Sequence, residues 1–474
     1  MYSLKYHKIN NVSHQDLICL FDNYQHQDYA CLLDSCENTS INSQFDIVVK
    51  QPVITFELKT KQISLKGAWK HKFSRCKQDC PFDSLSILHK EFCELFETKT
   101  DPALTSLPFV VGTLGCFAYD LNVVSDNIKD RNPTQFLMPD IALGFYDHSV
   151  IFDNLNSELY FIDWDEQRLQ QSVTDFQRTI TNKGQTPLNK GFELQSDWKA
   201  NIDRETYIQQ LSTVNEYLLA GDCYQVNFAQ RFSAKYKGSE WTAYKRLKKA
   251  NKAPYSAFIR LPNSCILSVS PERFLCIKDG QVETKPIKGT RKRSPNQKTD
   301  ASLAQALLAS EKDKAENLMI VDLLRNDLSK HCLAGSVKVP QLFKLESYPA
   351  VHHMVSTVVG ELKQQSSPFD ILKGAFPGGS ITGAPKIRAM QIIQELEPDK
   401  RSIYCGSIGY VGIKNDMDTN ICIRTLLAED GMMHCWAGGG IVIDSEAEDE
   451  YLETLHKVDK ILPVMAAKTS SDFD

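Results

Sequence analysis

Two short stretches of the chain hold an acid and an amine that could do chemistry together. Glu272 lies in the sequence Pro-Glu-Arg-Phe at residues 271–274, and Lys288 lies in Lys-Pro-Ile-Lys-Gly-Thr at residues 285–290. The turn signal Asp279-Gly280 between them predicts a β-hairpin that returns both residues to the same region. A lysine amine titrates near ~10.4, so it is a good nucleophile only when its pocket is partly desolvated. A solvated surface lysine is the alternative interpretation.

The register of this hairpin decides whether the Glu272 and Lys288 side chains lie on the same face. A strict two-residue turn would pair Glu272 with Ile287 and place Lys288 on the opposite face of the ribbon. A one-residue bulge beside Gly280 and Pro286 would restore the parity, and we expect one there.

Two predicted helices carry acids at a spacing that suits a hard cation. Ser302–Lys330 is predicted to be mostly helical, with Asp313 and Glu316 on one face. Ser445 and Glu448 form a capping-box pattern that begins a second helix. The residues on one face of that helix are Glu450, Glu453 and Lys457. Mg²⁺ takes oxygen ligands and keeps some waters, so these faces could hold it; solvated helix faces are the alternative.

The C-terminal part of the chain predicts three strands in a meander. These strands are Tyr404–Val411, Asn420–Leu427 and Met433–Ile443, with turns at 415–416 and 430–431. Gly438, Gly439 and Gly440 would weaken the last strand unless something approaches its backbone closely. A ligand carboxylate would explain the three glycines.

A glycine-rich segment at residues 378–386 is expected to open a helix, with Pro385 in its first turn. Its backbone N–H groups offer an anion site. A nucleotide P-loop requires Gly-Lys-Ser/Thr, whereas Lys386 follows a proline, so we do not expect nucleotide binding.

The first 165 residues show a mixture of strand and helix patterns. Strands are predicted at Asp46–Leu58 and Phe109–Tyr119, a helix at Phe82–Glu97, and a hairpin at Ser149–Trp164 that turns at residues 154–157. Asn182–Phe192 is the best linker candidate, being rich in Gly, Pro, Asn and Lys.

A helix and a strand follow this linker. Asp203 can cap the helix, which Gly221 stops. In the alternating strand after it, Gln225 and Asn227 share one face. If that face looks into a pocket, Gln225 is well placed to bind a ligand.

The composition excludes several classes of protein. The 474 residues, with 42% apolar side chains, can bury a large core, and a formal net charge of -5 makes nucleic acid an unexpected partner. The N-terminal residues have no apolar core of signal-peptide length, and no later stretch approaches 18 uninterrupted apolar residues. Fourteen cysteines without C-x-x-C pairs predict reduced thiols. We therefore expect a soluble cytoplasmic protein without membrane contact.

The residues around Glu272 and Lys288 carry a family resemblance. Ser270–Phe274 and Pro286–Thr290 resemble the chorismate-utilising enzymes, a family that includes anthranilate synthase component I, aminodeoxychorismate synthase component I, and the isochorismate and salicylate synthases. The lysine within the Pro-Ile-Lys-Gly-Thr motif is similar to that of aminodeoxychorismate synthase component I, because anthranilate synthases usually carry alanine there. The resemblance covers most of the chain and is densest between residues 200 and 462.

The resemblance implies a fold and a domain organisation. The fold would be of the α+β class, a large interleaved β-sandwich with helices on its outer faces. Residues 1–165 would form an N-terminal region like that of anthranilate synthase component I, and residues 200–465 the chorismate-binding catalytic region. We expect the two to form one compact unit.

The resemblance also implies the roles of individual residues. Lys288 would attack chorismate at C2 and Glu272 would supply a proton. The implied ligands of Mg²⁺ are Glu316 and Glu453, with Asp313 and Glu450 close behind. The implied substrate-binding residues are Gln225, Gly289, Thr290, His353, Tyr404, Arg424, Gly438, Gly439, Gly440 and Lys457. The positions that match a tryptophan site in relatives are Ser35, Asn42, Ser43, Gln44, Phe45, Pro254, Tyr255 and Ser256.

The reaction implied is the amination of chorismate at C4 to 4-amino-4-deoxychorismate, in the folate pathway through para-aminobenzoate. In the isochorismate and salicylate synthases a lysine that activates water stands at the position of Gln225, so water addition is not expected. None of the cysteines sits in a G-x-C-x-G nucleophile elbow, so ammonia is expected from a separate glutamine amidotransferase subunit. The alternatives are anthranilate synthase component I, in tryptophan biosynthesis, and a non-catalytic protein that senses an amino acid.

Overall fold

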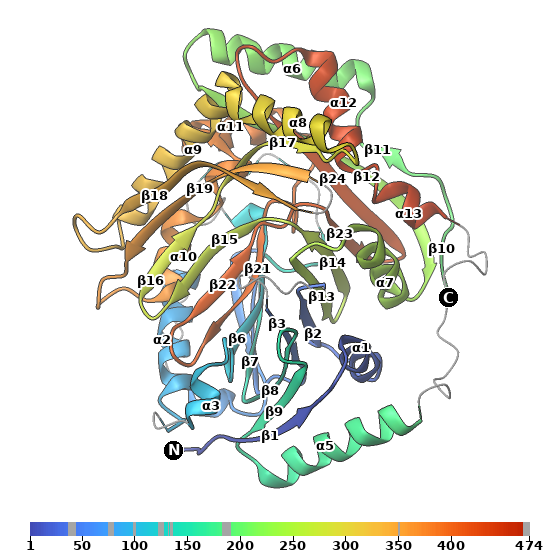
Figure 1. The fold of residues 1–474 in the computed structure, drawn as a ribbon, viewed down its shortest axis with the longest axis vertical. Coiled ribbons are helices and arrows are strands. Elements are labelled where there is room, and N and C mark those ends of the chain that lie inside the picture. Colours follow the sequence, from blue (N-terminus) through green and yellow to red (C-terminus); the bar gives the residue numbers. More distant parts are fainter. Residues whose placement is uncertain are drawn as a thin grey trace.

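Two large antiparallel sheets and the helices around them make up the computed structural model (Figure 1). It describes residues 1–36, 44–73, 80–97, 101–121, 128–130, 132, 136–182, 191–348 and 351–467. The predicted linker at Asn182–Phe192 lies mostly outside these residues. No helix of the described residues is long and apolar enough to cross a membrane.

The larger sheet contains strands from both ends of the chain. In spatial order its strands are β1 (Lys5–Asn10), β9 (Glu158–Asp163), β8 (His148–Asp153), β3 (Phe45–Val49), β2 (Cys31–Asp34), β13 (Tyr255–Leu261), β14 (Ser264–Ser270), β23 (Thr425–Glu429), β24 (Met432–Ile441), β12 (Gln225–Gly238) and β10 (Phe192–Leu194). Two short strands, β11 (Lys199–Ala200) and β20 (Gly383–Ala384), also pair with β12.

The smaller sheet is built in the same interleaved way. In spatial order its strands are β17 (Ile287–Lys292), β19 (Val351–Glu361), β16 (Gln281–Thr284), β15 (Arg273–Lys278), β22 (Met417–Asn420), β21 (Ser407–Gly412), β6 (Gly112–Phe117), β7 (Ile141–Tyr146), β4 (Ile54–Lys59) and β5 (Gln62–Lys66). β18 (Lys338–Ser347) pairs with β19. Each sheet therefore contains strands from before residue 165 and from after residue 200.

Helices lie around the sheets (Figure 1). The α-helices are α1 (His14–Asp22), α2 (Pro81–Cys93), α3 (Pro102–Thr105), α5 (Glu166–Thr181), α6 (Arg204–Leu219), α7 (Glu240–Asn251), α8 (Gln297–Ala309), α9 (Glu311–Ser329), α10 (Pro368–Ala375), α11 (Lys386–Leu396), α12 (Ala447–Lys457) and α13 (Leu462–Ala466). The 3₁₀ helices are η1 (Lys70–Lys72), η2 (Tyr119–Leu121) and η3 (Gly379–Ile381). The α+β architecture that the resemblance implied is confirmed.

One hydrophobic core draws side chains from both sheets. Phe56 and Phe145 come from the smaller sheet, whereas Ile259 and Trp436 come from the larger one. A second core lies on the other face of the larger sheet, where Trp241 of α7 and residues of α1 and α5 cover it. Burial on both faces explains why these strands are apolar on both sides rather than alternating.

Several local predictions are confirmed. The hairpin of residues 149–164 forms as β8 and β9 with Asp153 opposite Glu158. Asp203 caps α6 by accepting a hydrogen bond from the backbone N–H of Thr206. The turns at 415–416 and 430–431 connect β21 to β22 and β23 to β24.

Two stretches that the sequence predicts as single strands are each divided between the two sheets. Residues 46–58 span β3 and β4, and the chain leaves one sheet for the other at Gln51, with φ of 47°, and Pro52, which has no N–H to donate. Residues 420–427 span β22 and β23, with Arg424 at φ of 51° between them. The predicted meander is therefore wrong, because the chain changes sheets between β22 and β23.

The predicted capping box at Ser445 and Glu448 is also wrong. α12 begins at Ala447, with Glu446 at the N-cap and no side-chain cap. The Ser445 hydroxyl instead donates to Glu450 Oε1 at 2.6 Å. This contact takes up the side chain that the capping box would have used.

Candidate active site

The hairpin at Asp279-Gly280 forms, but its strands reach the site through a pairing that differs from the expected one. β15 pairs with β16 only from Cys276 to Lys278. Beyond this point β17 pairs with β19, and the register shifts between Ile287 and Thr290. The bulge thus lies at Lys288 and Gly289, where φ is 80°, and not beside Gly280.

Glu272 is held by a different strand from the one predicted. Its carbonyl accepts a hydrogen bond from the backbone N–H of Ile421 at 3.0 Å, and Arg273 pairs with Asn420 of β22. The Glu272–Ile287 pairing of a strict two-residue turn does not form, because β17 pairs with β19 and not with β15.

Ser380 connects the Glu272 carboxylate to the Lys288 amine. Its hydroxyl donates to Glu272 Oε1 at 2.9 Å, and its carbonyl accepts from Lys288 Nζ at 3.2 Å. Glu272 is 7% exposed and Lys288 is half-buried. The acid and the amine thus share one contact residue, which comes from η3.

Burial acts on both groups in the direction that nucleophilic chemistry needs. It lowers the pKa of Lys288, against the opposing charges of Glu316 and Glu272. It raises the pKa of Glu272, against the Ser380 hydrogen bond and the charges of Lys288 and Lys457. Both shifts favour the neutral amine beside the neutral acid.

The four predicted metal-binding acids face this region from α9 and α12. Burial raises the pKa of Glu316, and the charges of Asp313 and Glu450 raise it further. Burial also raises the pKa of Glu450, and the charge of Glu453 adds to this effect. Glu453 differs: burial would raise its pKa, but the Lys457, Lys312 and Lys288 charges outweigh burial and lower it. Among the described residues these acids do not form a closed cluster of metal-ligand atoms.

Asp313 lies slightly apart from the other three acids. A Cβ added to Gly289 would come within 2.9 Å of Asp313 Cγ, so this carboxyl packs directly against the bulge that carries Lys288. Its Oδ2 lies 3.1 Å from Arg291 Nη2. Asp313 therefore already has a cationic partner, as Glu453 does in Lys457.

The three glycines of β24 provide the floor of the site. A Cβ on Gly439 would meet Glu450 Oε2 at 3.1 Å, Glu453 Oε1 at 3.6 Å and Lys457 Nζ at 3.7 Å. Lys457 Nζ also donates to the Gly438 carbonyl at 2.9 Å and pairs with Glu453 Oε1 at 2.6 Å. Charged side chains therefore approach the backbone of β24 closely, as the glycines in this strand indicated.

Gln225 presents an unpaired amide beside the same strand. A Cβ on Gly440 would lie 2.2 Å from Gln225 Nε2, so only glycine leaves room there. Gln225 is 1% exposed, and its Nε2 has no hydrogen-bond partner among the described residues. A buried donor without a partner is costly, which fits a site that a ligand fills.

One cation, the Arg424 guanidinium, completes the site beside a neutral histidine. Arg424 is half-buried, its guanidinium makes no hydrogen bond or ion pair within the described part of the chain, and burial lowers its pKa. Burial and the Arg424 charge lower the pKa of His353 to about 4, so this imidazole is neutral. His353 Nδ1 lies 2.8 Å from the Thr290 hydroxyl. Arg424 is thus free to bind a carboxylate in two parallel hydrogen bonds.

Tyr404 lies behind the site and not on its surface. It is buried and stacks on Trp436 with an interplanar angle of 5°. Arg401 reaches within 5.8 Å of its ring centroid. The resemblance assigned Tyr404 to the substrate, and the described contacts place it in the layer that supports β24.

The sequence analysis missed the buried pair of Glu397 and Arg401. Arg401 Nε and Nη2 donate to the two Glu397 oxygens at 2.9 and 2.6 Å, and Nη1 donates to the Ile381 carbonyl at 3.0 Å. The sequence carried no clear signal for the pair, because α11 ends at Leu396 and Pro398 follows Glu397. Ser380 was also missed as an individual residue, although its glycine-rich segment was recognised.

The glycine-rich segment does not present its lysine to a ligand. Lys386 Nζ donates to Asp327 Oδ2 at 2.6 Å and to the Ala375 carbonyl at 2.8 Å. Pro385 occupies the N-cap of α11, one position before its predicted place. The lysine is therefore already paired, which disfavours a phosphate-binding role.

Several positions of the predicted tryptophan site lie around a buried polar cluster. The Ser35 hydroxyl donates to Asp46 Oδ1 at 2.6 Å, and Ser256 pairs with Asp34 across β2 and β13. Gln44 Nε2 donates to Asp153. Asn42 and Ser43 lie outside the described residues. Tryptophan binding stays a prediction.

A lysine neutralises this polar cluster. His14, Asp34 and Asp46 are the one group within the described ranges whose ligand atoms lie close enough for a metal ion. Lys248 Nζ, however, lies 2.7 Å from Asp34 Oδ2 and 3.1 Å from His14 Nε2. The cluster thus already contains a cation.

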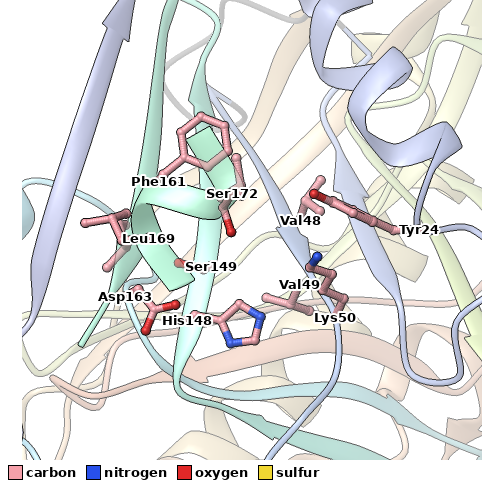
Figure 2. A pocket seen from close by; sticks show the side chains of 12 residues that line it. Tyr24, Val48, Val49, Lys50, His148, Ser149, Phe161, Asp163, Leu169 and Ser172 are labelled. Carbon is pink, nitrogen blue, oxygen red and sulfur yellow. The ribbon is translucent and has the colours of Figure 1, made fainter. Parts of the chain in front are cut away.

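Figure 2 shows a pocket that is separate from the candidate active site. It has about 340 Å³ of empty volume, including open solvent, and is lined by β3, β8, β9, α5 and the residue Tyr24 that follows α1. Lys50 and His148 supply its basic groups, and none of the predicted site residues lines it.

Comparisons with known proteins agree with this geometry. Residues 30–463 match the family described as chorismate binding enzyme. The chain is 44% identical over 422 residues, 89% of each protein, to aminodeoxychorismate synthase component 1 of Escherichia coli K12. It is 37% identical to anthranilate synthase component 1 of Aquifex aeolicus, over 74% of this chain and 73% of that protein. The crystal structure of anthranilate synthase component I from Streptococcus pneumoniae matches with a TM-score of 0.77 at 30% identity, over 89% of this chain and 93% of that one.

Proposed function

Because the chain belongs to the chorismate binding enzyme family, we propose that it aminates chorismate at C4 to give 4-amino-4-deoxychorismate. The observation that carries this proposal is the placement of Lys288 beside Glu272 and within the field of Glu316 and Glu453. The high identity to aminodeoxychorismate synthase component 1 supports it. The product would be a precursor of para-aminobenzoate and folate.

Burial matters because it changes how often the proton lies on the Glu272 carboxyl rather than on the Lys288 amine. With ordinary pKa values of 4.5 and 10.5, the neutral acid beside the neutral amine would be about a millionth of the population. Each pKa unit by which the two values converge multiplies that fraction about tenfold. Both shifts are in this direction, so burial increases the fraction of the neutral pair.

The proposed chemistry begins with the amine. Lys288 Nζ forms a bond to C2, the two ring double bonds shift, and the C4–O bond breaks. The hydroxyl leaves as water with the proton of Glu272, and the proton lost by the nitrogen returns to the Glu272 carboxylate. Ammonia then bonds to C4 as the double bonds shift back, and the lysine leaves C2 with a proton.

The remaining residues bind and orient the substrate. Arg424, with Thr290 and His353 beside it, is suited to one carboxylate of chorismate, and Lys457 with the Gly438–Gly440 backbone to another. The Gln225 amide can donate to a substrate oxygen. A bound substrate would thus pair the Arg424 guanidinium and the Gln225 Nε2, which have no partner among the described residues.

Mg²⁺ fits the donor set of the site. The carboxylates of Glu316, Glu450 and Glu453 offer the oxygen ligands that this ion prefers. Burial and the charges of neighbouring carboxylates raise the pKa of Glu316 and Glu450, and a divalent cation would offset both effects. We propose Glu316 and Glu453 as its ligands, with Asp313 and Glu450 behind them. The ion would supply charge neutralisation for a substrate carboxylate.

We further propose that a glutamine amidotransferase, component II of a heterodimer, supplies the ammonia in the cytoplasm. A relative named component 1 supports a two-component enzyme. The rival reaction, formation of anthranilate, would release pyruvate. Covalent capture at C2 by Lys288 argues against it, because that is the carbon that anthranilate formation aminates.

Intact-protein mass spectrometry tests the proposal. The enzyme is incubated with chorismate and Mg²⁺ without a nitrogen donor, and we expect a mass gain equal to chorismate minus water, on Lys288. Lys288→Ala should show no adduct, and Lys285→Ala, a nearby lysine that lies 3.6 Å from Glu346, serves as the matched control. Absence of the adduct, with pyruvate as a product once ammonia is added, would decide for anthranilate synthesis.

A further inference from the structure

Ser380 makes two different contacts with the reacting groups. Among the described residues, its carbonyl is the one hydrogen-bond partner of Lys288 Nζ, at 3.2 Å. Its hydroxyl is likewise the one group that donates to the Glu272 carboxylate, at 2.9 Å. A single residue thus contacts both the nucleophile and the acid, with its backbone toward one and its side chain toward the other.

We propose that Ser380 is a positioning residue that directs the Lys288 lone pair and supports proton transfer by Glu272. This inference rests on the proposed amination of chorismate. A neutral amine has two N–H bonds and one lone pair, so an N–H given to the Ser380 carbonyl restricts the direction of that lone pair. The hydroxyl supplies a hydrogen bond to the carboxylate that is left when Glu272 has given up its proton.

The turn that carries Ser380 is packed tightly. A Cβ on Gly378 would lie 2.7 Å from Ile421 Cδ1, and one on Gly379 would lie 2.5 Å from Leu323 Cδ2. The Thr382 hydroxyl donates to the Gly378 carbonyl at 3.0 Å. The two glycines let the chain pass between β22 and α9, which brings Ser380 to the acid and the amine.

The Glu397–Arg401 pair fixes the same turn to β12. Arg401 donates to the carbonyls of Ile381, at 3.0 Å, and Asn227, at 2.7 Å, and forms two hydrogen bonds with Glu397. Glu397 in turn accepts from the backbone N–H of Ala229 at 2.8 Å. Arg401 is 1% exposed, so solvent does not compete for these contacts. The residue next to Ser380 is therefore held by a buried charge.

The pH dependence separates this role from a structural one. The charged or titratable groups facing Glu272 are Lys288, Lys457 and the Cys405 thiol. The Ser380 hydrogen bond lowers the pKa of Glu272 while burial raises it. Removing the hydroxyl should raise the pKa of Glu272 further, so the acidic limb of the rate, where the Glu272–Lys288 pair takes up a second proton, should move to higher pH.

The experiment compares Ser380→Ala, Ser380→Thr and the wild type. We measure ammonia-dependent amination across pH, and adduct formation on Lys288 by mass spectrometry. In Ser380→Ala we expect turnover near neutral pH to fall by about 10- to 100-fold. We also expect the acidic limb of its pH profile to move to higher pH, whereas Ser380→Thr should recover both properties. Ser366→Ala, a half-buried serine whose hydroxyl makes no hydrogen bond among the described residues, is the matched control.

The outcomes separate the two proposals. A wild-type rate and profile in Ser380→Ala would overturn the positioning role, and so would an equal loss at every pH with no shift of the limb. If the wild-type enzyme itself forms no adduct on Lys288, the proposed function fails whatever Ser380 does. Adduct formation by the wild type with a shifted profile in Ser380→Ala supports both.

Discussion

Arg424 offers a test in which stability and function should move in opposite directions. Its guanidinium is half-buried, has no ion-pair partner among the described residues, and has a pKa that burial lowers. Replacing an uncompensated charge by a hydrophobic side chain of similar length is often neutral or stabilising. We therefore expect Arg424→Met to unfold at an unchanged or higher temperature, with a gain of at most ~1 kcal/mol, since the group is partly solvated.

The same substitution should remove much of the substrate affinity. Two charge-assisted hydrogen bonds to a carboxylate contribute about 1.5–3 kcal/mol each. Their loss corresponds to a weakening of chorismate binding on the order of 10²- to 10⁴-fold. Calorimetry with chorismate and Mg²⁺ measures the affinity, and thermal unfolding without ligand measures the stability.

A paired arginine provides the control for this experiment. Arg260 Nη2 lies 3.0 Å from Glu240 Oε2, and its Nε donates to the Gln25 carbonyl at 3.1 Å. Arg260→Met would leave Glu240 with the Tyr236 hydroxyl but without its cation, and we expect it to cost about 2–4 kcal/mol of stability while chorismate affinity stays unchanged. If Arg424→Met is destabilised as strongly as this control and still binds chorismate normally, Arg424 is a structural cation and the assignment is wrong.

Four further predictions follow from the same geometry. Lys288→Ala should lose most amination yet bind chorismate within a few-fold of wild type; full activity by product chromatography would exclude the covalent role. Glu453→Gln should raise the Mg²⁺ concentration needed for half-maximal rate by roughly tenfold or more, since one anionic ligand is lost, and an unchanged metal titration would remove α12 from the site. Gly439→Ala should keep the melting temperature within a few degrees but impair chorismate binding, because its Cβ would face Glu450 Oε2 at 3.1 Å; unimpaired binding by calorimetry would place the substrate elsewhere. Burial raises the pKa of Glu272, so the acidic limb of the rate should reflect its protonation at a pH above the ordinary glutamate range, and Glu272→Gln should abolish that limb together with most turnover.

Local patterns in the sequence were sufficient for many individual elements. Asp279-Gly280 makes a two-residue hairpin, and Asp203 caps its helix, because turn and cap chemistry depends on a few neighbouring residues. The pairing partner of β17 was not accessible in this way. Strand composition says that a segment can join a sheet, but which edge it joins is settled by residues far away in the chain.

The sequence by itself determined the reactive groups: a lysine and a glutamate in family motifs, acids on two helices, and glycines inside a strand. Only the tertiary structure decided their states. Burial lowers the pKa of Lys288 and raises that of Glu272 because segments from β17, the start of β15 and η3 enclose both groups together. The Arg424 guanidinium has no hydrogen-bond or ion-pair partner among the described residues, and it lies where the chain changes sheets. Desolvation and charge pairing depend on distances between segments that are remote in the sequence, so no local pattern could fix them.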